Sequence, residues 1–386
     1  MLNVKPLPIA TPLIDEESIN SWLLRASLNQ GCDLSTILLH HWSEHNLRHH
    51  DFDKGFNHIN MQIHQGMAML AESDVKSFDD RSLIKLNDDI GLKHQSNSSL
   101  TWVLPIPKFH SKTTVGHQYC YQCMQDDKNA YLKLKWRFSW SVYCEQHLTS
   151  LQDTCASCGL PYQPHLIKAH HQFINRCPHC REKLVMGAED RPLYKDAYEF
   201  QILAEQALFT NQAIAFDRSV TSAEWFELML FFMNLIRRST LERNLIYRLL
   251  MKALNIDIEG LELKKTKTGL KFDCLPYSER VMLIAYTMKL HKITFDNWLV
   301  VCQKNNLTQN SFRLGKRPII PKAFLPIYEE LPSVVRRQIK GQRTTLKPKS
   351  PKAVNISWER MQSRIERLKS YDQAKPNKRA RRTTKL

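Results

Sequence analysis

Apolar residues in the first part of the chain recur at the spacing of a helix. The first such set is Ile19, Trp22, Leu23 and Ala26. These positions are three or four residues apart and therefore share one helical face. The acidic run that starts at Asp15 places carboxylates in the first turn of this helix, and Gly31 is a natural end. Because a second helix is expected from Asp33, we predict that residues 1–103 form a helical domain with a helix-turn-helix-like pair.

The pattern becomes helical again in the C-terminal half. Thr221 and Glu224 form a capping box, and a long apolar face follows them. A further helix is expected over residues 294–303, followed by a turn and a short helix that ends near Leu314. We therefore predict a helical domain over residues 188–347 that contains a second helix-turn-helix-like unit.

Seven of the ten cysteines fall within 61 residues, and with one histidine they form four pairs of metal-ligand type. Two residues separate the members of each pair: Cys120 and Cys123, Cys144 and His147, Cys155 and Cys158, Cys177 and Cys180. A C-x-x-C turn presents two thiolates from one tight loop, and a second turn about twenty residues later closes a tetrahedron around zinc. We therefore predict two Zn²⁺ sites in tandem within residues 104–187. Redox thiols and disulfides are the alternatives to metal binding.

The simplest assignment pairs neighbouring turns, so that the first four ligands hold one ion and the last four hold the other. An interleaved arrangement, in which the first and third turns share a metal, stays open at this stage. Each site has four protein ligands and no open position for water or substrate, which is typical of structural zinc. A histidine close in sequence, one of His165, His170, His171 and His179, is the alternative ligand to Cys177.

Aromatic and aliphatic residues alternate between the two halves of the first predicted site. They are Trp136, Phe138, Trp140 and Val142. A period of two predicts a strand, here the hairpin strand that leads into the second ligand turn of a zinc ribbon. Small metal-stapled modules have few other residues for a core, which favours packing over base stacking for these aromatics. The expected fold is therefore mainly α, with two small zinc-ribbon-like β-knuckle modules between two helical domains.

Positive charge is concentrated at one end of the chain. The formal net charge is +17, and the segment from Arg313 to Leu386 holds 21 Lys and Arg against 5 Asp and Glu, a net charge of +16. A polycation is attracted to phosphate backbones, so DNA or RNA is the expected partner, and a solubilising or disordered tail is the alternative. Side chains able to contact bases or phosphates are Gln309, Asn310, Arg313, Lys316, Arg317, Arg336, Arg337, Lys340 and Arg343.

The last segment, residues 348–386, is expected to be a basic tail. Four apolar residues within it share one side of an amphipathic helix predicted from Trp358 to Tyr371, which suits docking on a partner. The residues from Lys375 onward are expected to be disordered because they are polar and strongly basic.

The sequence lacks the motifs of several common enzyme classes. It contains no Gly-x-x-x-x-Gly-Lys-Ser/Thr loop, no Gly-x-Ser-x-Gly elbow and no Gly-rich dinucleotide loop. Closed metal sites add no catalytic group, so we predict no catalytic residue, no cofactor besides zinc and no enzymatic activity. No apolar run approaches the length of a membrane span and the N-terminus lacks a signal-peptide pattern, which predicts a cytosolic protein without membrane contact.

Two further sequence features accompany the ligand pairs. Residues 12–25 read Pro-Leu-Ile-Asp-Glu-Glu-Ser-Ile-Asn-Ser-Trp-Leu-Leu-Arg, and Trp136-Arg137 lies between the first two ligand pairs. In this order, and followed by the pairs from Cys155 to Cys180, these parts resemble the TniQ/TnsD family of transposon target-selection proteins. The first segment is similar to the opening E-S-x-x-S-W/F-L-x-R helix of the family. The likeness covers about residues 8 to 185, and the length of 386 residues is similar to that of the short members.

The resemblance implies a non-catalytic adaptor for DNA transposition, a form of DNA recombination. Family members recruit an AAA+ ATPase regulator of the TnsC/TniB type, which in turn engages the transposase. Longer members bind an attachment site in DNA directly, whereas short members linked to CRISPR systems dock as a dimer on an RNA-guided Cascade complex. The resemblance therefore implies a homodimer in the bacterial cytosol or nucleoid. The basic C-terminal end keeps direct DNA binding open beside RNA-guided targeting.

Two other classes of function stay open at this stage. A zinc-containing transcription factor would bind DNA tightly and sequence-specifically without any transposon partner. A nucleic-acid enzyme would need acidic residues that converge in space from distant parts of the chain, which leave no linear pattern.

Overall fold

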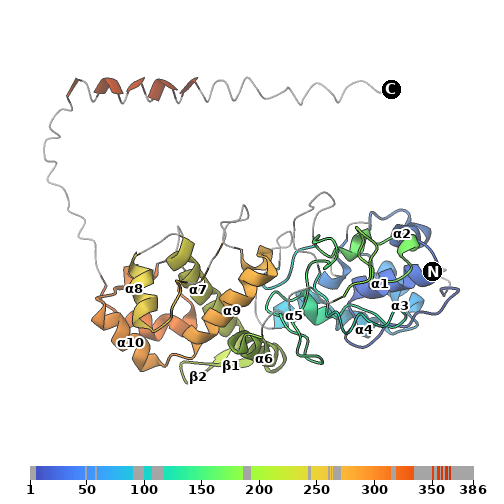
Figure 1. Ribbon diagram of the computed structural model, residues 1–386, viewed down its shortest axis with the longest axis horizontal. Coiled ribbons are helices and arrows are strands. Elements are labelled where there is room, and N and C mark those ends of the chain that lie inside the picture. The colour runs from blue at the N-terminus through green and yellow to red at the C-terminus, as the bar shows by residue number, and fades with distance from the viewer. Residues whose placement is uncertain are drawn as a thin grey trace. The chain divides into compact units, whose positions relative to one another are not determined.

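The computed structural model divides into two compact units, Met1–Ser333 and Val334–Leu386, which are described separately (Figure 1). In the first unit the structure describes residues 6–47, 50–56, 59–89, 100–106, 117–185, 193–241, 245–259, 261, 263, 271–313 and 319–333. In the second unit it describes residues 350–351, 354–356, 358–359, 361–363 and 365–366.

Helices form the first part of the first unit, as predicted (Figure 1). They are α1 (Ile19–Asn29), α2 (Leu34–Trp42), α3 (Met61–Leu70), α4 (Val75–Asp79) and α5 (Leu83–Asp89), with the 3-10 turn η1 (Phe52–Lys54) between α2 and α3. Trp22, Met67 and Phe78 are fully buried among them. The rings of Trp22 and Phe78 meet edge to face with centroids 5.4 Å apart, a favourable aromatic geometry. These helices therefore enclose a hydrophobic core of their own.

The start of α1 differs from the prediction, whereas its end agrees. The helix begins at Ile19, and the N-cap Ser18 accepts a hydrogen bond from the backbone N–H of Ser21 at 3.1 Å. The acidic run therefore precedes the helix, and no acidic residue lies in its first turn. The chain turns at Gly31 with a positive φ of 67°, a conformation that suits glycine, and α2 begins directly after its N-cap Asp33.

Helices also dominate the C-terminal part of the first unit. They are α6 (Lys195–Thr210), α7 (Ser222–Leu241), α8 (Leu245–Ala253), α9 (Tyr277–His291), α10 (Phe295–Lys304) and α11 (Leu325–Glu329), with the 3-10 turns η5 (Phe272–Cys274), η6 (Gln309–Phe312) and η7 (Lys322–Phe324). The capping box before α7 is confirmed: Thr221 and Glu224 each donate a backbone N–H to the side chain of the other. Strands β1 (Gln212–Ala215) and β2 (Arg218–Thr221) form an antiparallel hairpin that was not predicted.

The second predicted helix-turn-helix unit is not formed by the described residues. Helix α10 is followed by η6, a 3-10 turn of four residues, where a recognition helix was expected. Phe312 at the end of this turn is fully buried against Phe324, with ring centroids 5.1 Å apart. The segment is therefore held by packing against η7, and it lacks the length of a helix that enters a DNA groove.

The middle of the chain contains 3-10 turns and isolated bridges, and the predicted strand over residues 136–143 is wrong. The turns are η2 (Leu134–Arg137), η3 (Pro164–Leu166) and η4 (Ala169–His171). All eight residues from 136 to 143 are at most 3% exposed, so the alternation in sequence does not separate a buried face from a solvent face. The polar positions contact other segments instead: Arg137 bonds Asp53, and Ser139 donates to Asp273 at 2.7 Å. With both sides covered, this segment makes no strand ladder.

A second, larger hydrophobic core joins the cysteine-rich region to the C-terminal helices. Trp102 is fully buried, and its ring lies 5.7 Å from that of Trp140 and 5.4 Å from that of Phe226 on α7. Trp140 itself contacts Phe226 at 4.9 Å. The cysteine-rich region therefore packs as part of this unit, and the predicted limits at residues 103, 187 and 347 stay predictions.

The described residues of the second unit carry an exposed apolar row. Val354, Trp358, Met361 and Ile365 are 43–56% exposed, and they recur at alternating spacings of four and three residues. All four positions are helical; Trp358, Met361 and Ile365 belong to the helix predicted from Trp358 to Tyr371, Val354 precedes it, and the fourth residue of the predicted row, Leu368, lies outside the described residues. Across both units, no described helix has the length and apolar content needed to cross a membrane.

Candidate metal centres

The structure brings the eight predicted ligands together as two groups of four. The first group consists of Cys120, Cys123, Cys144 and His147, and the second of Cys155, Cys158, Cys177 and Cys180. Within each group the ligand atoms all lie within 4.8 Å of one another. This is the serial arrangement, in which neighbouring turns share a site, and not the interleaved one. Among the described residues no other cluster of metal-ligand type is present.

The distances inside each group test whether a zinc ion fits. A tetrahedron with Zn–S bonds of about 2.3 Å and Zn–N bonds of about 2.0 Å requires S···S distances of about 3.8 Å and S···N distances of about 3.5 Å. The Sγ atoms of Cys123 and Cys144 lie 3.7 Å apart, and Nδ1 of His147 lies 3.3–3.5 Å from the three sulfurs of its group. In the second group, two Sγ pairs are also 3.7 Å apart. Both donor sets therefore match tetrahedral zinc.

Local backbone geometry explains why the ligands converge. In three of the four turns, the N–H of the first ligand residue donates to the carbonyl five residues later, and its carbonyl accepts from the N–H four residues later. These turns start at Cys144, Cys155 and Cys177, with N···O distances of 2.7–2.9 Å. The fourth residue after each start, Leu148, Gly159 or Arg181, has a φ of 52–69°. This left-handed residue reverses the chain, so both ligand side chains extend to the same side.

Burial supplies a second argument for metal. The Sγ-bearing residues Cys120, Cys144, Cys155 and Cys177 are at most 1% exposed and belong to the larger hydrophobic core. Grouped thiolates in such surroundings would repel one another unless a cation neutralised them. His147 and Cys158 face solvent, so each group has one edge at the surface. Both groups therefore combine buried sulfur ligands with one edge at the surface, a setting that suits a bound metal ion.

The other histidines near the second group do not join it. His171 is buried, and its Nδ1 accepts a hydrogen bond from the backbone N–H of Lys168 at 3.0 Å. The backbone N–H of His179 donates to Sγ of Cys177 at 3.4 Å. That bond stabilises the thiolate without adding a ligand. The four cysteines, and not a substituting histidine, therefore form the second group.

A buried ion-pair network connects the metal region to the N-terminal helices. The guanidinium of Arg137, 1% exposed, donates to Asp53 at 2.6 Å and to both carboxylate oxygens of Asp51 at 2.9 and 3.0 Å. Burial opposes ionisation of Asp51, but Arg137 lowers its pKa to about 2. Burial and the neighbouring Asp51 instead raise the pKa of Asp53. The backbone N–H of Asn20 on α1 donates to Asp53 at 2.9 Å, so the network reaches the first helix.

A second network involves the segment around α1. Glu17 is fully buried, accepts two hydrogen bonds from Arg25 at 3.0 and 2.7 Å, and also accepts from the hydroxyl of Ser21 at 3.0 Å. The Ser21 hydroxyl in turn accepts a hydrogen bond from the backbone N–H of Leu132, which lies between the first and second ligand turns, at 2.9 Å. Trp22 donates its indole N–H to the carbonyl of Thr11. Through Ser21, the buried hydrogen bonds of this segment therefore hold α1 against the cysteine-rich region.

Of the predicted nucleic-acid contacts, only three lie in the described part of the chain. Asn310 and Arg313 are exposed, Gln309 is half-buried, and Nε of Arg313 donates to the hydroxyl of Tyr328 at 3.1 Å. The others lie outside the described residues: Lys316, Arg317, Arg336, Arg337, Lys340 and Arg343. The structure therefore locates three of these residues in or directly after η6, and nucleic-acid contact by all nine stays a prediction.

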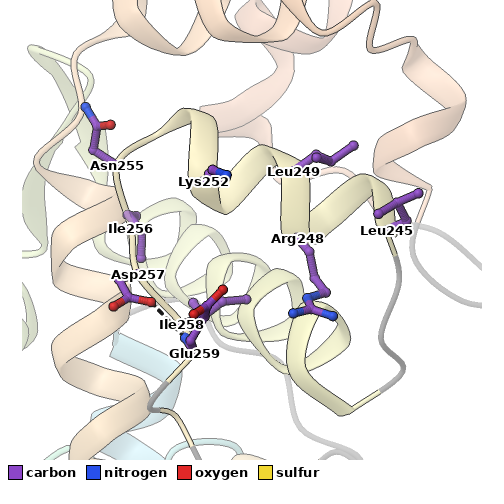
Figure 2. Close-up of a pocket in the computed structure, with 9 residues that line it drawn as sticks. All are labelled: Leu245, Arg248, Leu249, Lys252, Asn255, Ile256, Asp257, Ile258 and Glu259. Carbon is purple, nitrogen blue, oxygen red and sulfur yellow. Dashed lines mark hydrogen bonds between the residues drawn. The ribbon is translucent and has the colours of Figure 1, made fainter.

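A hollow of about 680 Å³ lies beside α8, where no site was predicted (Figure 2). Arg248 extends toward Glu259, and Leu245 and Leu249 of α8 also line the hollow (Figure 2). Two cations and two carboxylates line this hollow, so their charges cancel. It therefore shows no electrostatic preference for a phosphate-bearing ligand.

Comparison with known proteins identifies one family. The sequence profile of the family described as TniQ matches residues 8–151. The match contains α1 to α5, the ion-pair network of Arg137 and the first ligand group. No curated protein matches the chain.

Proposed function

Because residues 8–151 are a TniQ family domain, which implies a role in target selection for DNA transposition, we propose that the chain is a non-catalytic adaptor. In this role it bridges the recognition of a target, by an RNA-guided complex or by attachment-site DNA, to an AAA+ ATPase and the transposase. The family domain is the observation that carries the proposal. The two groups of four metal ligands agree with it, because a filled tetrahedron leaves no position for a reacting molecule.

The proposed cofactors are two zinc ions, one in each ligand group. When bound, each ion would offset part of the negative charge of its thiolates and crosslink two turns that are about twenty residues apart. The chain's own residues then transmit this rigidity. The aromatic contacts of Trp140 extend it toward α7, and the ion pairs of Arg137 extend it toward α1. An adaptor that presents surfaces to two partners requires such a rigid middle, since loosely joined parts would lose the geometry between the partners.

A reconstituted transposition reaction tests the adaptor role. Omission of this chain should reduce insertions at the selected target to background, while the ATPase and transposase keep any untargeted activity. The purified chain alone, with Mg²⁺ or Mn²⁺, should neither cut DNA nor transfer a strand. Metal-dependent nuclease or strand-transfer activity of the chain by itself would contradict the proposal and favour an enzyme. Tight sequence-specific DNA binding that has no effect on insertion would favour a transcription factor.

We further propose that the basic C-terminal segment contacts phosphate backbones. Deleting residues 349–386 removes 12 Lys and Arg and 3 Asp and Glu. DNA affinity should then fall by a similar factor for every sequence, and the slope of affinity against salt concentration should become shallower, because fewer counterions are released. Fluorescence anisotropy over a salt series measures both quantities. A chain whose tail has the same composition in scrambled order should bind like the full chain, and unchanged affinity after deletion would refute phosphate contact by the tail.

A further inference from the structure

The second unit carries the apolar row of Val354, Trp358, Met361 and Ile365, whose helical residues are drawn in red in Figure 1. We call these four residues the tail row. Each of them is 43–56% exposed, so the described part of the chain leaves the row open to solvent. Apolar side chains that gather in this way, with polar residues around them, are typical of a contact that a partner completes. The tail row is therefore a candidate interaction surface.

The tail row is narrow. Successive residues of an α-helix are turned by about 100°, so the four side chains fall within an arc of about 60°. A strip of this width is typical of a helix that packs along another helix, whereas a helix on a globular core has an apolar stripe of about 100° or more. Ile356, which is 43% exposed, falls on the opposite side of the helix. The width of the row therefore fits a helix as its partner surface.

Positive charge surrounds the tail row in the sequence. The unit Val334–Leu386 contains 17 Lys and Arg against 3 Asp and Glu, so at most three of its cations can pair one to one with an acidic side chain of the same unit. The rest of the chain has a formal net charge of +3, the difference between +17 and +14, and supplies no excess of carboxylates. The charge of the second unit therefore stays uncompensated within the chain, which favours a partner with an excess of carboxylates.

Charge and width together select among the possible occupants of the row. A second copy of the chain would bring an equal positive charge, which opposes the pairing of two tail rows. A phosphate backbone satisfies the charge but has no apolar surface to cover Trp358. An anionic membrane attracts a basic helix, but such a helix buries a wide apolar face, and here Glu359 and Glu366 directly follow two members of the row. A helix with an apolar strip and carboxylates beside it satisfies both requirements.

We propose that the tail row docks on a helix of a protein partner whose apolar strip is flanked by carboxylates. Trp358 and Met361 insert between the apolar side chains of that helix, as in the seam of a coiled coil, and the basic residues of the second unit attract its carboxylates. The attraction between charges speeds association and weakens as salt is added, whereas the apolar contact sets the lifetime of the complex. The inference rests on the proposed function in one respect only, namely that an adaptor has protein partners.

Two synthetic helical peptides test this inference on the full chain. Both consist of three heptads with leucine at the first and fourth positions; one has glutamate at the positions that flank the leucines, and the other has lysine there. Each peptide carries a fluorescent label, and its binding is measured by anisotropy. The acidic peptide should bind, and the basic peptide should bind more weakly by about tenfold or more. Trp358→Ser and Met361→Ser should each raise the dissociation constant of the acidic peptide by about tenfold, as expected for the loss of a central contact.

Ile356→Ser is the matched control for the two row variants. It removes an apolar side chain of similar exposure from the opposite side of the helix and introduces the same serine, so it should bind the acidic peptide like the unaltered chain. None of the three substitutions changes the charge, so DNA affinity and its salt slope should stay as in the unaltered chain. Because all three residues are exposed and belong to the second unit, the melting temperature and zinc content of the variants should also stay unchanged.

Several outcomes would overturn the inference. They are equal binding of the two peptides, no binding of either, and a loss of binding in Ile356→Ser as large as in the row variants. Vesicles of phosphatidylglycerol that bind the unaltered chain but not the row variants, without binding of the acidic peptide, would assign the row to a membrane surface. DNA affinity that falls in the row variants, again without peptide binding, would assign it to nucleic acid. The adaptor role is tested separately, by omission of the chain from the transposition reaction, and stands or fails independently of these results.

Discussion

Replacing Cys144 with serine is expected to remove one of two bound zinc ions and to lower the melting temperature by roughly 10 °C or more. A serine hydroxyl does not ionise at neutral pH, so it cannot replace a thiolate as a zinc ligand. The effect is large because Cys144 is 1% exposed and belongs to the core that joins the ligand turns to α7. Metal binding contributes on the order of 10 kcal/mol to the folding of isolated zinc modules, and loss of one ligand sacrifices much of it.

Atomic absorption and calorimetry measure the two expected changes. The unaltered chain should contain two zinc ions, and Cys144→Ser and Cys177→Ser should each contain one. Cys32→Ser is the matched control, because Cys32 is half-buried and lies outside both ligand groups. It should keep both ions and nearly the same melting temperature. An unaltered chain purified from zinc-supplemented medium that contains no zinc would refute the assignment of both sites.

Arg137→Ala is expected to lower the free energy of unfolding by about 3–5 kcal/mol. The substitution leaves two carboxylates, Asp51 and Asp53, buried without their cation. The cost of burying unpaired charge exceeds the cost of losing the hydrogen bonds alone. The stability of Arg137→Lys should lie between that of the unaltered chain and that of Arg137→Ala, because lysine keeps the charge but cannot donate to both carboxylates with a planar group. Denaturant unfolding followed by circular dichroism measures these differences.

The matched control for this prediction is Arg176→Ala. Arg176 pairs with Asp127 at 3.4 Å, but both side chains are about one-third exposed. Pairs exposed to solvent contribute about 0–1 kcal/mol, so this variant should unfold almost like the unaltered chain. Equal effects of Arg137→Ala and Arg176→Ala would show that the Arg137 network does not hold the N-terminal helices to the metal region.

The ligand turns were predictable from the sequence because their geometry is local. The two ligands of each turn are three positions apart, and the hydrogen bonds that close three of the turns span at most five residues. Gly159 also marked its turn, since it adopts the left-handed conformation that glycine favours. Leu148 and Arg181 take the same conformation without any such mark. Spacing was therefore a better guide than residue type.

The prediction for residues 136–143 failed because it depended on what lies beyond the segment. Alternation predicts a strand when one face is solvated, yet Ser139 and Ser141 are as buried as Trp140. Ser139 donates to Asp273, and the backbone carbonyl of Ser141 accepts from Gln118 at 3.0 Å. The partners of these residues are far away in the sequence. The period-two alternation of the sequence alone could not reveal that both faces of this segment are covered by other parts of the chain.

The residues that carried the family likeness have structural tasks that the sequence did not reveal. Glu17, Ser21 and Arg25 form one buried network, and Arg137 forms another with Asp51 and Asp53. Both networks tie α1 to the cysteine-rich region. The acidic run before α1 was assigned to the helix dipole, but buried Glu17 instead neutralises Arg25.

The sequence by itself indicated the helices, the capping box before α7, the eight candidate metal ligands and the TniQ likeness, because each depends on residues close together in the chain or on a recognisable order of motifs. Only the tertiary structure decided the serial grouping of ligands and the ion-pair networks. These features join residues such as Asp53 and Arg137, which form a buried ion pair although they are far apart in the chain. Such neighbours leave no periodic pattern, since their proximity results from packing and not from local conformation.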